Sequence, residues 1–192
     1  RRGILYPSVR QMRSIAMTPD YILDVFQVDV GEEPRQIDWI VHIMDENASA
    51  PADRNPLLAR TEPFTLPDTG AYRWLRNAQS VPLAVEPSAS TDVIALEWQD
   101  KHDRLGLRML NTNLERLILC GYPATDEPDS GSIPMLMARI NAPRAVFVAV
   151  WLIGDAATDV RIKTLPDHEG RLVYEVTANG NLRRHHIPKL WK

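Results

Sequence analysis

Residues 144–152 read RAVFVAVWL and are apolar at every position after the first. Side chains alternate between the two faces of a β-strand, so Phe147 and Trp151 point to one face and Val148 and Val150 to the other. A strand that is apolar on both faces is typical of the middle of a sheet that other layers cover on both sides. This stretch therefore predicts the central strand of a layered β protein.

Segments of similar length and alternating character lie on both sides of this strand. They are rich in β-branched and aromatic residues, and residues typical of turns separate them. No long stretch keeps a helical period, and only residues 71–78 suit a short helical segment. We therefore predict an all-β fold, an antiparallel multi-stranded β-sandwich, that covers residues 1–192 as a single domain. Its predicted strands are residues 20–30, 35–44, 92–99, 104–110, 116–122, 134–140, 144–152 and 171–177.

Two segments are predicted to form part of the surface. In residues 104–110, Arg104, Gly106 and Arg108 alternate with apolar residues, which predicts one face toward solvent or a ligand. Residues 45–70 are rich in proline, and we expect a long surface segment there that its apolar side chains hold against the core. These side chains are Leu57, Leu58, Phe64 and Leu66.

The composition indicates a globular chain and argues against several classes of protein. The 192 residues are 44% hydrophobic and carry a net charge of −3, which does not favour nucleic-acid binding. Cys120 is the only cysteine, so neither an intrachain disulfide nor a cysteine-rich zinc site can form. The longest uncharged apolar stretch, residues 145–154, is too short to span a membrane. The sequence begins Arg1-Arg2-Gly3 without a methionine, so we expect a processed product or part of a longer protein; its location stays open between the bacterial cytoplasm and the periplasm.

The stretch DWIVH at residues 38–42 holds the most informative polar pair. On a strand, Asp38 and His42 share the face opposite Trp39, but they lie about 13 Å apart, too far to ligate one metal ion together. His42 is therefore either a metal ligand with partners from elsewhere or a hydrogen-bonded core histidine.

Other polar groups are explained without a site. The adjacent His185 and His186 would point to opposite faces of a strand, which argues against joint chelation. Cys120 lies on an apolar strand and is expected to be a buried, inert thiol. The acidic group near residue 127 lacks the glycine and glutamate of a calcium-binding loop. The polar group near residue 102 suits a hairpin turn. These groups are Asp126, Glu127 and Asp129, and Asp100, His102 and Asp103.

The sequence contains no self-contained catalytic signature, such as a Gly-x-Ser-x-Gly turn, a glycine-rich phosphate loop or a zinc-binding helix. Catalytic and substrate-binding residues therefore stay unassigned. Aromatic side chains beside arginines such as Arg73 and Arg76 could stack on sugar rings, although most aromatic residues of an all-β chain belong to the core. They are Trp39, Tyr72, Trp74, Trp98 and Trp191.

Several segments together resemble the carboxy-terminal β-sheet region of heparinase II/III-like polysaccharide lyases, and most closely the exolytic oligoalginate lyase branch. The resemblance spans most of the chain and is strongest over residues 5–44. It rests on LYP at 5–7, RQMR at 10–13, DYILDVF at 20–26, QIDWIVH at 36–42, MARI at 137–140 and AVFVAV at 145–150.

The resemblance implies a division of labour between two parts of a longer enzyme. In that family an upstream α/α toroid supplies the catalytic tyrosine and histidine for β-elimination at a uronic acid, and a β-sandwich closes over the cleft. Nothing in this sequence matches the toroid, and Tyr6 and Tyr21 are not placed as catalytic residues. His42 matches the histidine of an Asp-Trp-x-x-His motif that binds a structural metal in several members. The resemblance thus implies one zinc or other divalent ion, shared with upstream residues.

Two hypotheses follow for function. The first is the β-sandwich portion of a polysaccharide lyase that cleaves uronate-containing saccharides, alginate-like or heparinoid, with the upstream toroid and the saccharide as partners. The alternative is a non-catalytic carbohydrate-binding or structural β-sandwich module.

Overall fold

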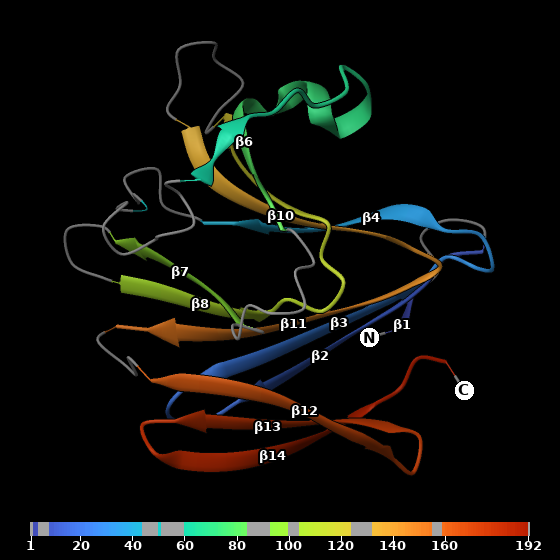
Figure 1. The fold of residues 1–192 in the computed structure, drawn as a ribbon, viewed down its shortest axis with the longest axis vertical. Helices are drawn as coiled ribbons and strands as arrows, with labels where there is room; N and C mark the ends of the chain where they lie inside the picture. Colours follow the sequence, from blue (N-terminus) through green and yellow to red (C-terminus); the bar gives the residue numbers. More distant parts are fainter. Residues whose placement is uncertain are drawn as a thin grey trace.

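The computed structural model describes residues 2–3, 8–43, 50, 60–83, 93–99, 104–123, 132–154 and 159–191. These residues form three β-sheets stacked in layers (Figure 1). A six-stranded middle sheet lies between a five-stranded upper sheet and a three-stranded lower sheet. Neighbouring strands within each sheet pair antiparallel. The predicted all-β sandwich is confirmed, with a third layer added to it.

The order of the strands in each sheet differs from their order in the chain. The middle sheet runs β1 (Arg2–Gly3), β2 (Arg10–Met17), β3 (Ile22–Asp29), β11 (Arg144–Ile153), β8 (Arg104–Leu110) and β7 (Val93–Gln99). The upper sheet runs β4 (Arg35–His42), β10 (Ser132–Ala142), β9 (Arg116–Pro123), β6 (Arg76–Pro82) and β5 (Glu62–Pro63). The lower sheet runs β12 (Val160–His168), β13 (Arg171–Ala178) and β14 (Asn181–Pro188). A short 3-10 helix, η2 (Gly70–Trp74), precedes β6.

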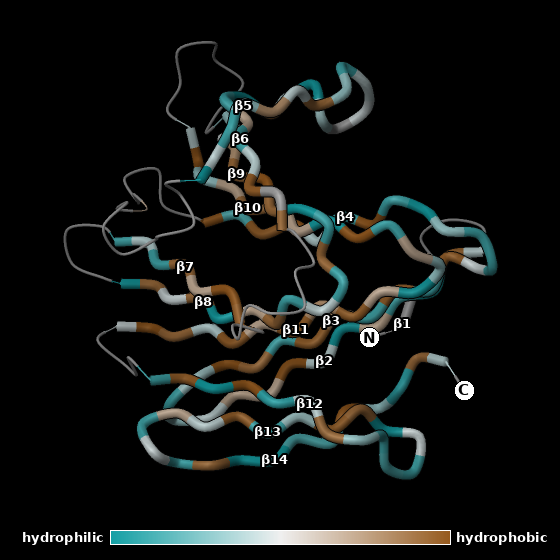
Figure 2. Tube along the Cα trace, viewed as in Figure 1, coloured by the Kyte–Doolittle hydropathy of each residue, from teal (hydrophilic) through white to brown (hydrophobic). Residues whose placement is uncertain are grey.

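Strand β11 lies between the two hydrophobic cores of the protein. Phe147 faces the upper sheet, where its ring stacks on Trp39 with 6.2 Å between the ring centroids. Val148 and Val150 face the lower sheet and belong to the second core, with Tyr174 of β13. Apolar residues accordingly line both faces of the middle sheet, and Figure 2 shows how rich its central strands are in hydrophobic residues. The prediction of a central strand covered on both sides is confirmed.

The prediction for the polar face of β8 is wrong. Arg108 is only 8% exposed, because its guanidinium donates to a Glu97 carboxylate oxygen at 3.1 Å and to the Leu107 carbonyl oxygen at 3.1 Å. Gly106 leaves room for the neighbouring β11 side chain, since a Cβ atom there would lie 3.3 Å from Leu152. The alternation of arginine and glycine with leucine reflects a buried ion pair and a close side-chain contact, not a face open to solvent or ligand.

Several strands escaped sequence analysis because solvent-facing polar residues hide their period. β14 reads NLRRHHIP, and most of its side chains are exposed. Residues 71–78, which suited a short helix, divide between η2 and the start of β6. Within the proline-rich segment, Phe64 and Leu66 pack against the outer face of the upper sheet as expected. Leu57 and Leu58 lie outside the described residues.

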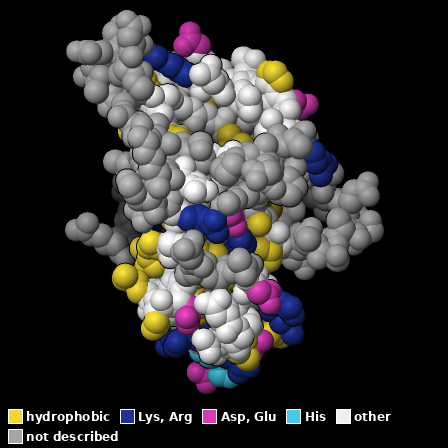
Figure 3. All heavy atoms as spheres, turned by 90° about the vertical axis from the view of Figure 1, so that its left-hand side faces the viewer, with side chains coloured by type: hydrophobic (Ala, Val, Ile, Leu, Met, Phe, Trp, Pro, Cys, Tyr) yellow, Lys and Arg dark blue, Asp and Glu magenta, His cyan; other side chains and the backbone are white. Residues whose placement is uncertain are grey.

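Positively and negatively charged side chains are mixed on the described surface. On the face that Figure 3 presents, basic and acidic side chains are interspersed with hydrophobic ones. None of the helices in the described ranges is long and apolar enough to cross a membrane.

Candidate functional site

A buried ion pair anchors the outer face of the upper sheet. Asp38 on β4 lies directly opposite Arg139 on β10 in the antiparallel register. The Arg139 guanidinium donates two hydrogen bonds, from Nε to Oδ1 at 2.8 Å and from Nη2 to Oδ2 at 3.1 Å. Their side chains are 7% and 9% exposed. Since both oxygens of Asp38 accept hydrogen bonds from Arg139, this carboxylate has a structural role.

Tyr72 of η2 completes this cluster from above the sheet. Its hydroxyl donates to Asp38 Oδ2, and Gln36 Nε2 donates to the Tyr72 hydroxyl oxygen at 2.9 Å. Burial, together with the hydrogen bond to Asp38, raises the pKa of Tyr72 above its usual value of 10.0. Tyr72 is therefore a neutral donor that fastens η2 to the sheet.

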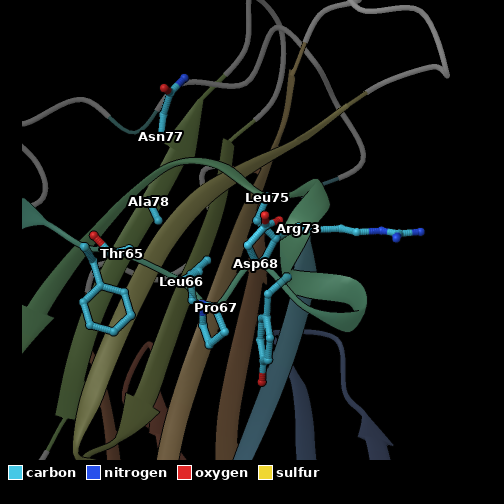
Figure 4. Close-up of a pocket in the computed structure, with 10 residues that line it drawn as sticks. Thr65, Leu66, Pro67, Asp68, Arg73, Leu75, Asn77 and Ala78 are labelled. Carbon is cyan, nitrogen blue, oxygen red and sulfur yellow. The ribbon is translucent and has the colours of Figure 1, made fainter.

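A pocket opens beside Tyr72, between the segment that precedes η2 and the first part of β6 (Figure 4). Its volume is about 300 Å³. Its apolar walls pack on Ile118, Cys120, Met135 and Met137 of the upper sheet. It is lined by Phe64, Thr65, Leu66, Pro67, Asp68, Tyr72, Arg73, Leu75, Asn77 and Ala78.

Arginines of the upper sheet hold the wall of this pocket in place. The guanidinium carbon of Arg116 lies 4.8 Å from the centroid of the Phe64 ring, and that of Arg139 lies 5.8 Å from it. Arg116 also donates to Ser80 Oγ at 2.6 Å. The ring of Phe64 thus rests on fixed cations, so its position is set before any ligand arrives.

Three of the tryptophans that sequence analysis singled out differ sharply in burial. Trp39 and Trp98 are core residues, as expected for most aromatics of an all-β chain. Trp74, at the end of η2, is 50% exposed and has the Arg73 guanidinium carbon 4.7 Å from its ring centroid. The signal for this site in the sequence was the run of Tyr72, Arg73 and Trp74; the pocket itself could not be located because its walls come from separate segments.

His42 lies on the outer face of the upper sheet, the face it shares with Asp38 as predicted. Its side chain is exposed, so the interpretation as a buried core histidine is wrong. The imidazole packs edge-on against Tyr122 of β9, with 5.6 Å between ring centroids. In the described ranges, no group of three or more histidine, cysteine, aspartate or glutamate side chains could hold a metal ion. His42 would therefore be a lone ligand within these residues, and a metal shared with upstream residues stays a prediction.

The remaining candidates behave as ordinary structural residues. Burial raises the pKa of the Cys120 thiol to about 11, as expected for an inert cysteine. His185 and His186 do point to opposite sides of β14: His185 Nε2 lies 2.7 Å from the Tyr21 hydroxyl, and His186 packs edge-on against His168. The acidic group of residues 126–129 and the polar group of residues 100–103 lie outside the described residues.

Comparison with known proteins identifies the fold. No protein-family model matches the chain, and no curated protein sequence matches it. Among solved structures, a mutant of heparan sulfate lyase HepC from Pedobacter heparinus matches 100% of this chain with a TM-score of 0.57 and 14% sequence identity. Another structure of HepC matches 97% of the chain with a TM-score of 0.55, also at 14% identity. The chain shares its fold with one region of this lyase.

The match covers only part of the lyase. This chain spans 26% of the HepC mutant chain and 25% of the other HepC chain. At this identity the likeness shows that the two proteins share a fold. It does not show the substrate or the catalytic role of this chain. The oligoalginate branch of the family stays a prediction.

Proposed function

We propose that this chain is the β-sandwich portion of a polysaccharide lyase that cleaves uronate-containing saccharides by β-elimination. The observation that carries this proposal is the match of the entire chain to one region of a heparan sulfate lyase. The sequence resemblance to heparinase II/III-like lyases, which rests on residues such as those of QIDWIVH at 36–42, points independently to the same class of enzyme.

We assign proton transfer to another part of the full-length protein as part of this proposal. β-Elimination at a uronate requires a base, an acid and a group that neutralises the sugar carboxylate, all within hydrogen-bond reach. Tyr21 and His185 form a hydrogen-bonded pair of suitable residue types, but Tyr21 is buried between the middle and lower sheets and cannot reach a polysaccharide. Tyr72 is bound to Asp38 and holds η2. In the described part of the chain neither tyrosine is therefore available for proton transfer, and we propose that the β-sandwich supports a cleft whose catalytic groups come from elsewhere in the full-length protein.

The alternative function, a non-catalytic carbohydrate-binding module, is favoured by one observation. Trp74 exposes half of its surface, and the guanidinium of Arg73 lies over its ring. Exposed aromatic side chains next to polar groups are suited to stacking on the apolar face of a sugar ring.

A comparison of the full-length gene product with the 192-residue chain tests the proposal. Both are incubated with heparan sulfate and with alginate oligosaccharides, and the ultraviolet absorbance of the unsaturated uronate product is followed. We expect product from the full-length protein and none from the chain alone. A full-length protein that yields no product from any uronate polymer would overturn the lyase function, and product from the chain alone would overturn the assignment of catalysis to another region.

A further inference from the structure

Two arginines share the carboxylate of Asp29 at the end of the middle sheet, beside the carboxy-terminal segment (Figure 1). In the antiparallel register, Asp29 of β3 lies opposite Arg10 of β2 on one side and opposite Arg144 of β11 on the other. Residues directly opposite each other project to the same face of a sheet. Arg10 Nη2 and Arg144 Nε both contact the same oxygen, Asp29 Oδ2, the latter at 3.7 Å. The pairing of three strands therefore brings two guanidinium groups to one point.

This cluster carries one positive charge more than its carboxylate neutralises. Burial would raise the pKa of Asp29, but the Gly31 N–H and the two arginines more than offset that effect, so the pKa lies below its ordinary value of 3.8. Two cations thus surround one ionised carboxylate. The buried carboxylates of Asp24 and Asp38 differ, because a single arginine binds both oxygens of each.

Both arginines of the cluster keep hydrogen-bond donors open to solvent. The side chains of Arg10 and Arg144 are 55% and 50% exposed, whereas that of Asp29 is 4% exposed. A guanidinium group has five N–H donors. Among the described residues, the Arg10 side chain bonds Asp29 alone, and the Arg144 side chain contacts Asp29 and Trp191. The glutamates at 32–33 follow in the next turn, but within the described ranges they form no ion pair with either arginine. Most of these donors are therefore available to an anion.

The carboxy-terminal segment holds Arg144 in place. The fully buried Gln27 of β3 donates from Nε2 to the Pro188 carbonyl oxygen at 2.8 Å and accepts from the Leu190 N–H at 2.9 Å. These bonds fix the backbone next to Trp191, whose ring centroid lies 5.7 Å from the guanidinium carbon of Arg144. A side chain whose position is already restricted loses less conformational freedom when it binds a ligand.

From these contacts we propose that Arg10 and Arg144 together bind one anionic group of an acidic saccharide, a carboxylate or a sulfate. The anion accepts hydrogen bonds from both guanidinium groups, and Asp29 holds the two arginines next to each other. This inference rests on the proposed function, which supplies acidic saccharides as the ligands. The site binds the anionic group and takes no part in cleavage.

Calorimetric titration of the 192-residue chain tests the site. The probes are an unsulfated alginate tetrasaccharide, a sulfated heparan sulfate tetrasaccharide and a neutral cello-oligosaccharide of the same length. We expect the acidic probes to bind at least about tenfold more tightly than the neutral one, as for charge-assisted hydrogen bonds. Binding of both acidic probes would assign the site to the carboxylate, and binding of the sulfated probe alone would assign it to sulfate. Equal binding of the neutral probe, or no binding of either acidic probe, would overturn the proposal.

Two variants and a matched control assign the binding to this cluster. We expect Arg10→Gln and Arg144→Gln each to weaken the acidic probes by about tenfold. Arg73→Gln is the control, because Arg73 likewise lies over a tryptophan ring, at 4.7 Å from Trp74, but belongs to η2. Circular dichroism confirms that each variant is folded. Wild-type affinity in both cluster variants, or displacement of the saccharides by an equal concentration of inorganic sulfate, would overturn the proposal.

Asp29→Asn distinguishes a binding site from an ion cluster that serves the fold alone. Removal of the carboxylate charge leaves both guanidinium groups without their partner, so we expect the acidic probes to bind about fivefold more tightly. Unchanged or weaker binding by the folded variant would overturn the proposal. If Asp29→Asn does not fold, the two arginine variants decide the outcome.

The lyase assay separates failure of the site from failure of the proposed function. Product formation by the full-length protein, together with absence of saccharide binding by the chain, would overturn the site alone. Binding of acidic saccharides that is lost in Arg144→Gln, with no product from the full-length protein, would support the site and overturn the lyase function.

Discussion

Tyr21 and His185 join the middle and lower sheets through a hydrogen bond of 2.7 Å between the Tyr21 hydroxyl oxygen and His185 Nε2. Burial, and then the nearby charge of Arg183, lowers the pKa of His185 below its ordinary value of 6.5. The imidazole is therefore neutral at the interface between the sheets at neutral pH.

This relationship predicts the dependence of stability on pH. Because the folded pKa of His185 is depressed, the unfolded chain binds more protons just below pH 6.5, and the free energy of unfolding falls as the pH drops through that range. Denaturant unfolding of the wild type and of His185→Gln between neutral and mildly acidic pH measures this. We expect a flatter profile for the variant, and identical slopes in the two proteins would contradict the prediction.

Removal of the charge on Asp38 should destabilise the protein strongly. Asp38→Asn leaves Arg139 buried without its carboxylate partner, which costs about 3–5 kcal/mol of unfolding free energy for a buried pair. The control is Asp159→Asn, which removes an exposed ion pair with Arg161 and should change the unfolding free energy by less than about 1 kcal/mol. Equal effects of the two substitutions in urea unfolding would show that burial of the Asp38 pair has no energetic consequence.

The upper core should depend on the ring of Phe147. Phe147 is 1% exposed and stacks on Trp39, so Phe147→Ala should lower the unfolding free energy by about 3–5 kcal/mol. Ile153→Ala is the matched control on the same strand, since Ile153 is 64% exposed and should cost less than about 0.5 kcal/mol. Thermal unfolding of the two variants measures the difference; a similar loss for both would be inconsistent with a core position for Phe147.

The predicted metal ligand is tested by elemental analysis. In the full-length protein, His42→Ala should lower the zinc or other divalent metal content and the melting temperature together, because a structural metal contributes folding free energy. The control is His186→Ala, since His186 is likewise exposed but lies on β14 of the lower sheet. Equal metal content in wild type and His42→Ala would remove the ligand assignment.

The architecture could be predicted from the sequence where the layers that cover a strand determine which of its residues are apolar. Phe147 and Val150 report two covered faces, so β11 was placed in the middle from its own residues. Strand β14 was missed because only one face is covered and its exposed polar residues, among them Arg183, Arg184 and His186, break the apolar period. Arg108 misled the analysis, since its partner Glu97 lies on the adjacent strand and local alternation carries no information about it.

The candidate site was harder to predict for the same physical reason. Asp38 and Arg139 are separated by 101 positions in the chain, and only the pairing of β4 with β10 brings them together. Tyr72 and Trp74 could be named as exposed aromatics beside arginines, but not placed. Whether a carboxylate is a ligand or half of an ion pair depends on which strand becomes its neighbour.

The position of β11 between two cores has a consequence for how the protein opens. Its backbone amides pair with β3 on one side and β8 on the other, and its side chains are shared by both cores. Any fluctuation that exposes these amides to deuterium exchange must break contacts in both layers at once. The slowest-exchanging amides of the chain should therefore cluster on β11, and their opening free energy should equal that of global unfolding, which couples the upper and lower sheets into one cooperative unit.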